Sequence, residues 1–244
     1  NVNPCCEIPV ITCPSNIVVS NDNGVCGAMV TFAASATGTS PVITYSQNPG
    51  TLFPIGTTTV TATATNDCGT DICTFTVTVN DTENPVITCP ATANITTDLG
   101  MCTSTASIGT ATGTDNCGTP VITFSPAAPY GLGSTTVTWT ATDANGNIAT
   151  CTQVVTVTDG ENPIITCPAD VSTCSSTPAL GTPVTSDNCG TVTTTNDAPG
   201  VFPIGTTIVT WTADDGNGNT ETCTQTVTVN SPPTAIISGS TTIC

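Results

Sequence analysis

Apolar and polar residues alternate along several stretches of this chain. Val137, Trp139 and Ala141 share one parity with threonines between them, and residues 75–79 ("FTVTV") repeat the arrangement. Such period-2 runs, broken by clusters of Gly, Asn, Asp and Pro, predict half-buried antiparallel β-strands. Trp211 occupies the position equivalent to Trp139, and we interpret both tryptophans as core residues rather than as a platform for a ligand.

The alternating stretches belong to a longer repeat. "VITCP" at Val10–Pro14 returns at Val86–Pro90 and, as "IITCP", at Ile164–Pro168. Each copy also contains a "FPIGTTTVTATAT"-like strand and closes with a strand that begins at a cysteine, which is Cys73, Cys151 or Cys223. We therefore expect three tandem modules, each a small sandwich of six or seven strands.

The composition supports an all-β fold and excludes several functions. Thr makes up roughly a quarter of the 244 residues, while Leu and Lys, which favour helices, are rare or absent. The chain has 17 Asp and Glu and no Lys, Arg or His, so its formal net charge is −17. Such a chain repels nucleic acid and anionic membrane surfaces. No apolar run approaches the ~18 residues that a membrane helix needs, so we expect no membrane insertion.

Enzymatic chemistry is also disfavoured by this composition. Without His or Lys there is no ordinary general base, and without Arg there is no cationic group to stabilise an oxyanion. Pairs of carboxylates are the remaining catalytic possibility. We expect a protein that is not an enzyme.

The motifs together resemble a known family. "ENPVITCP", "DNCG", "FPIGTTTVT" and "TATDANGNIATC" are similar to the hyalin repeat (HYR) module, an immunoglobulin-like sandwich that occurs in tandem in extracellular adhesive proteins. The Thr-rich, Cys-bearing style also resembles very large surface adhesins of gliding Bacteroidetes, which are exported by the type IX secretion system. The resemblance implies three disulfide-stapled immunoglobulin-like modules in an extended rod.

The repeat boundaries give an expected domain layout. We assign residues 1–8 to the end of a preceding domain or linker, 9–82 to module 1, 83–160 to module 2 and 161–231 to module 3. Residues 232–244 resemble the start of a further immunoglobulin-like domain.

Fifteen cysteines without a histidine indicate disulfides formed in an oxidising compartment, so we expect a secreted or cell-surface protein. Each module holds four cysteines, and the first and last of each are expected to pair. Module 1 lacks the "DNCG" cysteine and has Cys68 instead, which suggests a relocated partner for Cys26. The expected pairs are Cys13–Cys73, Cys26–Cys68, Cys89–Cys151, Cys102–Cys117, Cys167–Cys223 and Cys174–Cys189.

Two alternatives to this pairing stay open at the level of sequence. Module 1 also permits Cys68–Cys73 beside Cys13–Cys26, and buried free thiols are a third arrangement. Cys5, Cys6 and Cys244 lie outside the four-cysteine sets, and we expect their partners in neighbouring domains.

Acidic residues gather where one module ends and the next begins. Carboxylate and amide oxygens are the ligands that Ca²⁺ prefers, and acidic linkers between sandwiches are also found in cadherins. Turn formation alone also explains these residue types. The expected Ca²⁺ ligands are Asp81, Glu83, Asn84, Asp143, Asn145, Asn147, Asp159, Glu161, Asn162, Asp214, Asp215, Asn217 and Asn219.

These observations favour a stalk region of a large cell-surface adhesin, which spaces and presents an adhesive tip. Its partners would be other modules of the same chain and a surface or glycan ligand. A self-assembling extracellular filament made of copies of the chain is the alternative, because the strand edges carry none of the lysines that usually protect them. A calcium-dependent carbohydrate-binding module is the third, and the low aromatic content of 4% disfavours it.

Overall fold

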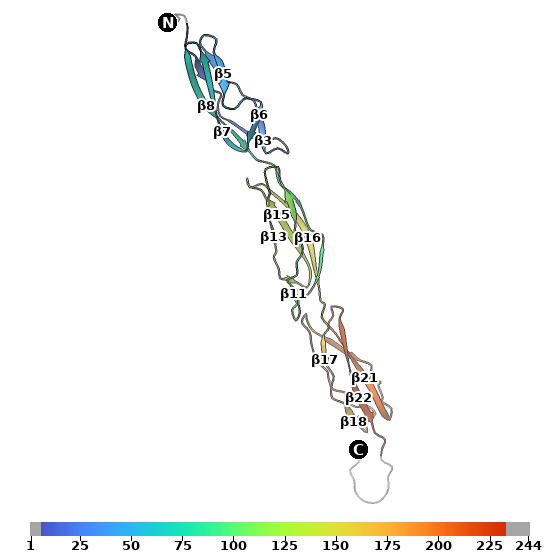
Figure 1. The fold of residues 1–244 in the computed structure, drawn as a ribbon. Coiled ribbons are helices and arrows are strands. Elements are labelled where there is room, and N and C mark those ends of the chain that lie inside the picture. The colour runs from blue at the N-terminus through green and yellow to red at the C-terminus, as the bar shows by residue number, and fades with distance from the viewer. Residues whose placement is uncertain (1–5, 233–244) are drawn as a thin grey trace, which may run out of the picture. The chain divides into compact units, whose positions relative to one another are not determined.

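The computed structural model describes residues 6–232, and their regular elements are all β-strands (Figure 1). No helix in this part of the chain is long and apolar enough to span a membrane. The chain divides into two compact units. The first contains Asn1–Pro90, Thr110–Ser125 and Thr138–Thr152, and the second contains Ala91–Gly109, Pro126–Val137 and Gln153–Cys244. The division passes through module 2, so each junction between consecutive modules lies inside one unit.

Module 1 is a two-layer β-sandwich. One layer is a four-stranded sheet in the order β2-β8-β7-β5, and the other consists of the pairs β1-β4 and β3-β6. The pairing of β2 with β8 is parallel, with Ile17 opposite Val77, whereas the other pairs are antiparallel. The expectation of antiparallel strands throughout is therefore wrong for this pair. The strands are β1 (Val10–Thr12), β2 (Ile17–Ser20), β3 (Gly27–Val30), β4 (Ser35–Thr37), β5 (Val42–Tyr45), β6 (Thr51–Pro54), β7 (Gly56–Asn66) and β8 (Gly69–Asn80).

Module 2 repeats this topology. Its four-stranded sheet has the order β10-β16-β15-β13, and the parallel pair is β10-β16. The small pairs are β9-β12 and β11-β14. The strands are β9 (Val86–Thr88), β10 (Ala93–Thr96), β11 (Thr103–Ser104), β12 (Thr112–Thr114), β13 (Val121–Ser125), β14 (Tyr130–Gly131), β15 (Gly133–Thr142) and β16 (Ile148–Thr158).

Module 3 has the same four-stranded sheet, in the order β18-β22-β21-β20, with β18 parallel to β22. The pair β17-β19 lies in its second layer. The strands are β17 (Ile164–Thr166), β18 (Val171–Thr173), β19 (Val184–Ser186), β20 (Thr193–Asn196), β21 (Gly205–Asp214) and β22 (Thr220–Val229).

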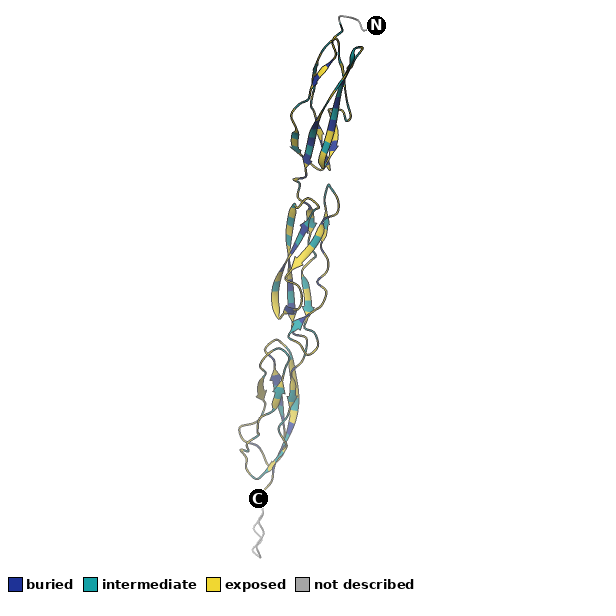
Figure 2. Cartoon of the chain, turned by 90° about the vertical axis from the view of Figure 1, so that its left-hand side faces the viewer, coloured by how far each residue is buried: buried dark blue, intermediate teal, exposed yellow. Residues whose placement is uncertain are grey.

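The apolar residues that alternate with threonines in the sequence are the ones whose side chains are buried in the sandwiches. Figure 2 shows buried and more exposed positions following one another along the long strands. In module 1, Phe75, Val77 and Val79 on β8 face inward and pack with Phe53 of β6. The predicted core tryptophans are buried as well, with Trp139 at 4% and Trp211 at 6% exposure.

Modules 2 and 3 share a polar core element that module 1 lacks. In module 3 the indole Nε1 of Trp211 donates to Oε1 of Gln225 at 3.1 Å, and Gln225 is fully buried. Gln225 Nε2 in turn donates to the carbonyl oxygens of Ala169 and Leu180. The buried glutamine therefore satisfies carbonyl groups of two segments that lie outside the strands.

Gln153 takes the same place in module 2 and donates to the carbonyl oxygens of Ala91 and Ile108, each at 2.7 Å. In module 1 the equivalent positions hold Ala62 and Phe75. The aromatic ring thus lies on the neighbouring strand in module 1, and both equivalent positions are apolar and buried there.

Candidate functional site

The two linkers between modules are short and partly buried. The first linker (residues 81–85) joins β8 to β9, and the second (residues 159–163) joins β16 to β17. Asp81 is 8% exposed and Asp159 is 9% exposed. Oδ1 of each aspartate accepts the backbone N–H two residues later, that of Glu83 or Glu161, at 3.1 Å. These bonds give both linkers the same turn.

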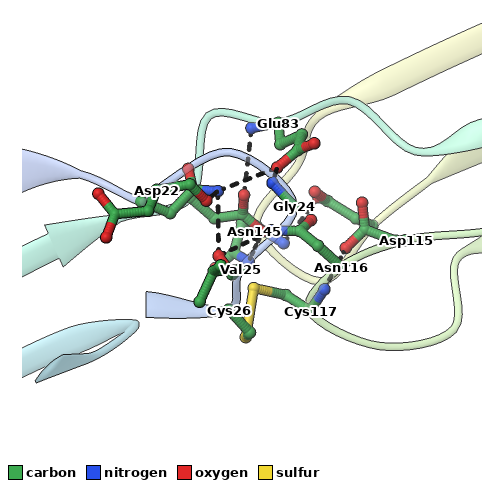
Figure 3. Close-up of a disulfide and its surroundings, with 12 residues drawn as sticks. Asp22, Gly24, Val25, Cys26, Glu83, Asp115, Asn116, Cys117 and Asn145 are labelled. Atoms are coloured by element: carbon green, nitrogen blue, oxygen red, sulfur yellow. Dashed lines mark hydrogen bonds between the residues drawn. A yellow bond between two sulfur atoms is a disulfide. The ribbon is translucent and has the colours of Figure 1, made fainter. Parts of the chain in front are cut away.

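The linker glutamates hold a loop of the preceding module. Glu83 Oε2 accepts the backbone N–H of Gly24 at 2.8 Å, in the β2–β3 loop (residues 21–26). Glu161 Oε1 accepts the backbone N–H of Gly100, in the β10–β11 loop (residues 97–102). Both glycines have a φ of +70°, which disfavours other residues. Figure 3 shows the Glu83 carboxylate directed at Gly24.

The same two loops also contact the module that follows. The "DNCG" loops, residues 115–118 of module 2 and 187–190 of module 3, each place an asparagine against the loop of the previous module. Asn116 Nδ2 donates to the carbonyl oxygen of Val25 at 3.1 Å, and Asn188 Nδ2 donates to that of Met101 at 2.9 Å. At each junction, the linker and the DNCG loop thus both hydrogen-bond to the same loop of the preceding module.

Disulfides join the modules at these loops. Cys26 is bonded to Cys117 (Figure 3), and Cys102 is bonded to Cys189, with Cα atoms 4.7 and 4.8 Å apart. Each bond connects the loop before the linker to the DNCG loop after it. Consecutive modules are therefore covalently linked by a side-chain bond in addition to the backbone.

These bonds correct three of the expected pairs, namely Cys26–Cys68, Cys102–Cys117 and Cys174–Cys189. Cys102 bonds Cys189 at the second junction and Cys117 bonds Cys26 at the first, so they are not partners of each other. Cys174 is disulfide-bonded, but not to Cys189.

Cys68 instead bonds Cys6, so Cys6 belongs to module 1 and has no partner in a neighbouring domain. The Glu7 carbonyl oxygen next to it accepts a hydrogen bond from Asn66 Nδ2 at 2.8 Å. Cys5 and Cys244 lie outside the described residues, as do most of the residues assigned to a further domain.

The disulfides that were expected between the first and last cysteines of each module are present. They tie the segment after the opening strand to the closing strand. The pairs are Cys13–Cys73, Cys89–Cys151 and Cys167–Cys223.

A turn before the last strand completes each junction. In module 3, Asp215 Oδ1 accepts the backbone N–H groups of Asn217, Gly218 and Asn219, while Oδ2 accepts Asn219 Nδ2 at 2.7 Å. Burial raises the pKa of Asp215, but these hydrogen bonds outweigh it and hold the pKa below the ordinary value. Asn219 Nδ2 also reaches the carbonyl oxygen of Asp159 at 3.5 Å.

The equivalent turn of module 2 has the same design. Burial raises the pKa of Asp143, and hydrogen bonds from Asn147, Asn145 and Gly146 more than reverse this, leaving the pKa lowered. Asn147 Nδ2 reaches the Asp81 carbonyl oxygen at 3.3 Å, and Asn145 Nδ2 donates to Asp81 Oδ2 at 2.9 Å. We call residues 143–147 and 215–219 the DxNGN turns.

Carboxylates meet where linker, DNCG loop and DxNGN turn converge. At the second junction, one oxygen each of Asp159, Asp187 and Asp215 lie within 4.8 Å of one another. At the first junction, Asp81 and Asp115 meet in the same way beside the sulfur of Cys117, which is held in its disulfide. Either arrangement offers oxygen ligands of the kind that hard cations prefer.

The structure brings only part of the expected ligand set together. Glu83 and Glu161 face the loop of the preceding module. Asn84 is exposed, Asn162 is exposed with Nδ2 donating to Glu221 at 3.4 Å, and exposed Asp214 accepts the Gly216 N–H. Sequence reasoning missed the DNCG residues Asp115, Asn116, Asp187 and Asn188. The repeated "DNCG" was their signal, but it was used only for its cysteine.

Comparison with known proteins places this chain in a family. The HYR domain family matches residues 6–79, 80–157 and 158–229. The chain is similar to hyalin of Lytechinus variegatus, with 35% identity in an alignment 257 residues long, gaps included, that covers 93% of this chain and 48% of hyalin. It is also similar to hyalin of Strongylocentrotus purpuratus, with 31% identity covering 91% of this chain and 20% of hyalin. The chain thus spans about half or less of these relatives.

A shorter similarity joins the chain to a rat protein, the sushi, von Willebrand factor type A, EGF and pentraxin domain-containing protein 1. It has 33% identity and covers 45% of this chain and 3% of that protein. Among solved structures, titin domains I67–I69 align over 92% of this chain and 99% of the titin chain, at 13% identity and a TM-score of 0.44. From the three matches along its length, the chain belongs to the HYR domain family.

Proposed function

We propose that the chain is a stalk region of an extracellular adhesion-type repeat protein, whose tandem modules hold an adhesive part away from the surface that carries it. The observation that carries this proposal is the pair of disulfides between consecutive modules, Cys26–Cys117 and Cys102–Cys189. Disulfides in such number persist in oxidising surroundings, which supports a place outside the cell.

The junction contacts suit a spacer because they oppose bending at the linker. The β2–β3 loop is bonded to the linker through Glu83 and to the next module through Asn116 and Cys117. The Cys26–Cys117 bond closes a loop with a sequence separation of 91 residues. By the chain-entropy argument such a cross-link contributes about 4–5 kcal/mol against unfolding.

The relatives are longer than this chain. The chain spans about half of one hyalin and a fifth of the other, and we propose that the adhesive part, with its surface or glycan ligand, belongs to other domains of a longer protein. The relatives named above come from sea urchins and a rodent. They give no support to gliding motility or type IX secretion, which stay predictions from composition and repeat style.

Small-angle scattering tests the stalk proposal. The oxidised chain is compared with the double variant Cys26→Ser/Cys117→Ser, which removes one bond between modules and creates no new free thiol. We expect the oxidised chain to show one long maximum dimension and the variant to show a broader distribution of distances. The second junction, unchanged in this variant, is the internal control. A compact oxidised chain, or a variant with an unchanged profile, would contradict a stiffened spacer.

A filament is the second candidate, and one observation favours it. Val10, Val86 and Ile164 lie at equivalent positions of the three modules and are 61, 66 and 66% exposed. Repeated apolar residues on short strands offer a surface for a second copy. Light scattering against concentration, followed by electron microscopy, distinguishes the two. Regular fibres of several chains favour the filament, whereas single threads favour the stalk.

The carbohydrate-binding alternative receives less support. Its natural stacking groups, Trp139 and Trp211, are buried in their modules and are not available to a sugar.

A further inference from the structure

The second junction concentrates negative charge without a balancing side chain. Asp159, Asp187 and Asp215 come from three separate segments, which are the linker, the DNCG loop and the DxNGN turn. Their nearest oxygens lie within 4.8 Å of one another. The whole chain contains no Lys, Arg or His, so no side chain of this protein is able to neutralise them. Three carboxylates at this spacing repel one another.

Two oxygens in this cluster also lack hydrogen-bond donors. Asp159 is 9% exposed, and among the described residues its Oδ2 has no donor, while Oδ1 accepts from Glu161, Thr97 and Asn188. Asp187 Oδ1 is likewise buried without a donor, although Oδ2 accepts the Cys189 N–H at 2.7 Å. A buried carboxylate oxygen without a partner is costly, so these atoms indicate a ligand.

The surroundings prepare the three carboxylates for a cation. Hydrogen bonds from the DxNGN turn fix the orientation of Asp215, and the backbone of Cys189 fixes that of Asp187. A pocket of about 250 Å³ is lined in part by Glu161, Asp187 and Asn188, so it borders the cluster at Asp187. Oxygen-only, anionic ligands select hard divalent cations over soft ones.

We propose that Asp159, Asp187 and Asp215 bind one divalent cation at the second junction, and that this cation is Ca²⁺. Water would complete the shell, since Ca²⁺ takes 6–8 oxygens. The ligand set differs from the one expected from sequence, because Asp187 replaces Glu161, whose carboxylate holds Gly100. The inference concerns this chain alone and holds whether the modules form a stalk or a filament.

The first junction provides a weaker version of the site. Asp115 takes the place of Asp187, and Asp115 Oδ1 and Asn116 Oδ1 are also buried without a donor among the described residues. Here, however, Asn145 Nδ2 already occupies Asp81 Oδ2 at 2.9 Å, and two carboxylates rather than three share the group. We therefore expect the second junction to bind Ca²⁺ more tightly than the first.

Isothermal titration of the metal-free, oxidised chain with Ca²⁺ tests the site, with Asp187→Asn as the main variant. An asparagine retains an oxygen for the Cys189 N–H but removes the charge. We expect binding at the tighter site to be weaker by at least about 10-fold, because Ca²⁺ affinity depends on the number of charged ligands. Glu161→Gln should retain that affinity, and Glu7→Gln, which removes a charge from an exposed residue, is the matched control. Equal affinity in Asp187→Asn and wild type, or no binding by wild type, would overturn the proposal.

Thermal unfolding gives an independent test, because the difference in unfolding temperature between wild type and Asp187→Asn should change sign when Ca²⁺ is added. Without metal, Asp187→Asn should unfold at a higher temperature than wild type, because it relieves repulsion. With saturating Ca²⁺ the order should reverse, because only wild type gains the full binding free energy. A variant that is less stable under both conditions would show that Asp187 is a structural residue and would overturn the assignment. A larger response to Mg²⁺ than to Ca²⁺ would overturn the choice of cation.

Discussion

The side-chain amide of Asn116 donates to the backbone carbonyl of Val25, and the neighbouring residues Cys117 and Cys26 are joined by a disulfide. Asn188, Met101, Cys189 and Cys102 repeat this relationship at the second junction. A hydrogen bond and a covalent bond thus act on adjacent residues of the same two loops. The repetition identifies the arrangement as the rule by which one module is attached to the next.

Peptide mapping without reduction should recover the bonds Cys26–Cys117 and Cys102–Cys189. Trypsin has no site in a chain without Lys or Arg, so pepsin is the suitable protease, and its acidic buffer also suppresses disulfide exchange. Recovery of a Cys102–Cys117 peptide would contradict the attachment rule.

The same map tests how the array continues. Cys174 occupies the position of Cys26 and Cys102, which both bond forward to the next module. We therefore expect Cys174 to pair with a cysteine that follows module 3, and Cys244 is the cysteine of the sequence that satisfies this order. A peptide linking Cys174 to Cys5 would break the rule.

Replacing Gly100 by alanine should weaken the second junction by about 1–2 kcal/mol, because its φ of +70° is unfavourable for a residue with a Cβ. Its N–H, which Glu161 accepts, would also be displaced. Hydrogen exchange of the linker amides is the measurement, and exchange should rise around Glu161. Gly131→Ala is the control, since a Cβ there meets no atom within 4 Å and its φ lies outside the left-handed region.

Gln225→Leu should destabilise module 3 by about 2–4 kcal/mol, although the side chains are similar in size. The change leaves the indole N–H of Trp211 and the carbonyl oxygens of Ala169 and Leu180 without their partner. Denaturant unfolding followed by the fluorescence of Trp211, in a Trp139→Phe background, measures it. Unchanged stability would mean that water replaces the amide at no cost.

Acid should remove the stability that the hydrogen-bonded carboxylates of the two DxNGN turns give to the folded protein. Because the pKa values of Asp143 and Asp215 are lowered in the folded protein, their contribution is complete above the ordinary aspartate value of 3.8 and is lost as the pH falls below it. The melting temperature of metal-free wild type is compared with that of Asp143→Asn/Asp215→Asn. The difference should be constant from pH 7 to about 5 and shrink below 3.8. A difference that shrinks above pH 5 would point to other carboxylates.

The sequence predicted the sandwich strands because burial follows side-chain parity, as Phe75, Val77 and Val79 show. It did not predict that β2 and β8 run parallel, since parity contains no information on strand direction. The bonds between the first and last cysteines of the modules followed from their positions in the repeat, whereas the Cys6–Cys68 bond did not, because Cys6 was assigned outside module 1.

The bonds between modules did not follow, for a physical reason. Because the modules repeat, modules 2 and 3 each have a loop cysteine and a DNCG cysteine at a similar spacing. This spacing is the same whether a loop cysteine bonds the DNCG cysteine of its own module or that of the next module. Only the fold shows that a loop leaving one end of a sandwich meets the DNCG loop of its neighbour. The ligand role proposed for Asp187 could not be predicted either, because Asp187 meets Asp159 and Asp215 only in the folded junction.

The disulfide pattern also determines how the chain carries tension. The shortest covalent route from Cys6 to Cys223 crosses the Cys6–Cys68, Cys89–Cys151 and Cys167–Cys223 bonds. The only backbone on this route runs from Cys68 to Cys89 and from Cys151 to Cys167. Most strands of the sandwiches lie off this route. They would therefore bear no tension along the chain, whether folded or unfolded. The stretches that do bear it contain the closing strand β8, most of the closing strand β16 and the linkers with Asp81 and Asp159, so extension of the cross-linked chain is confined to these two stretches.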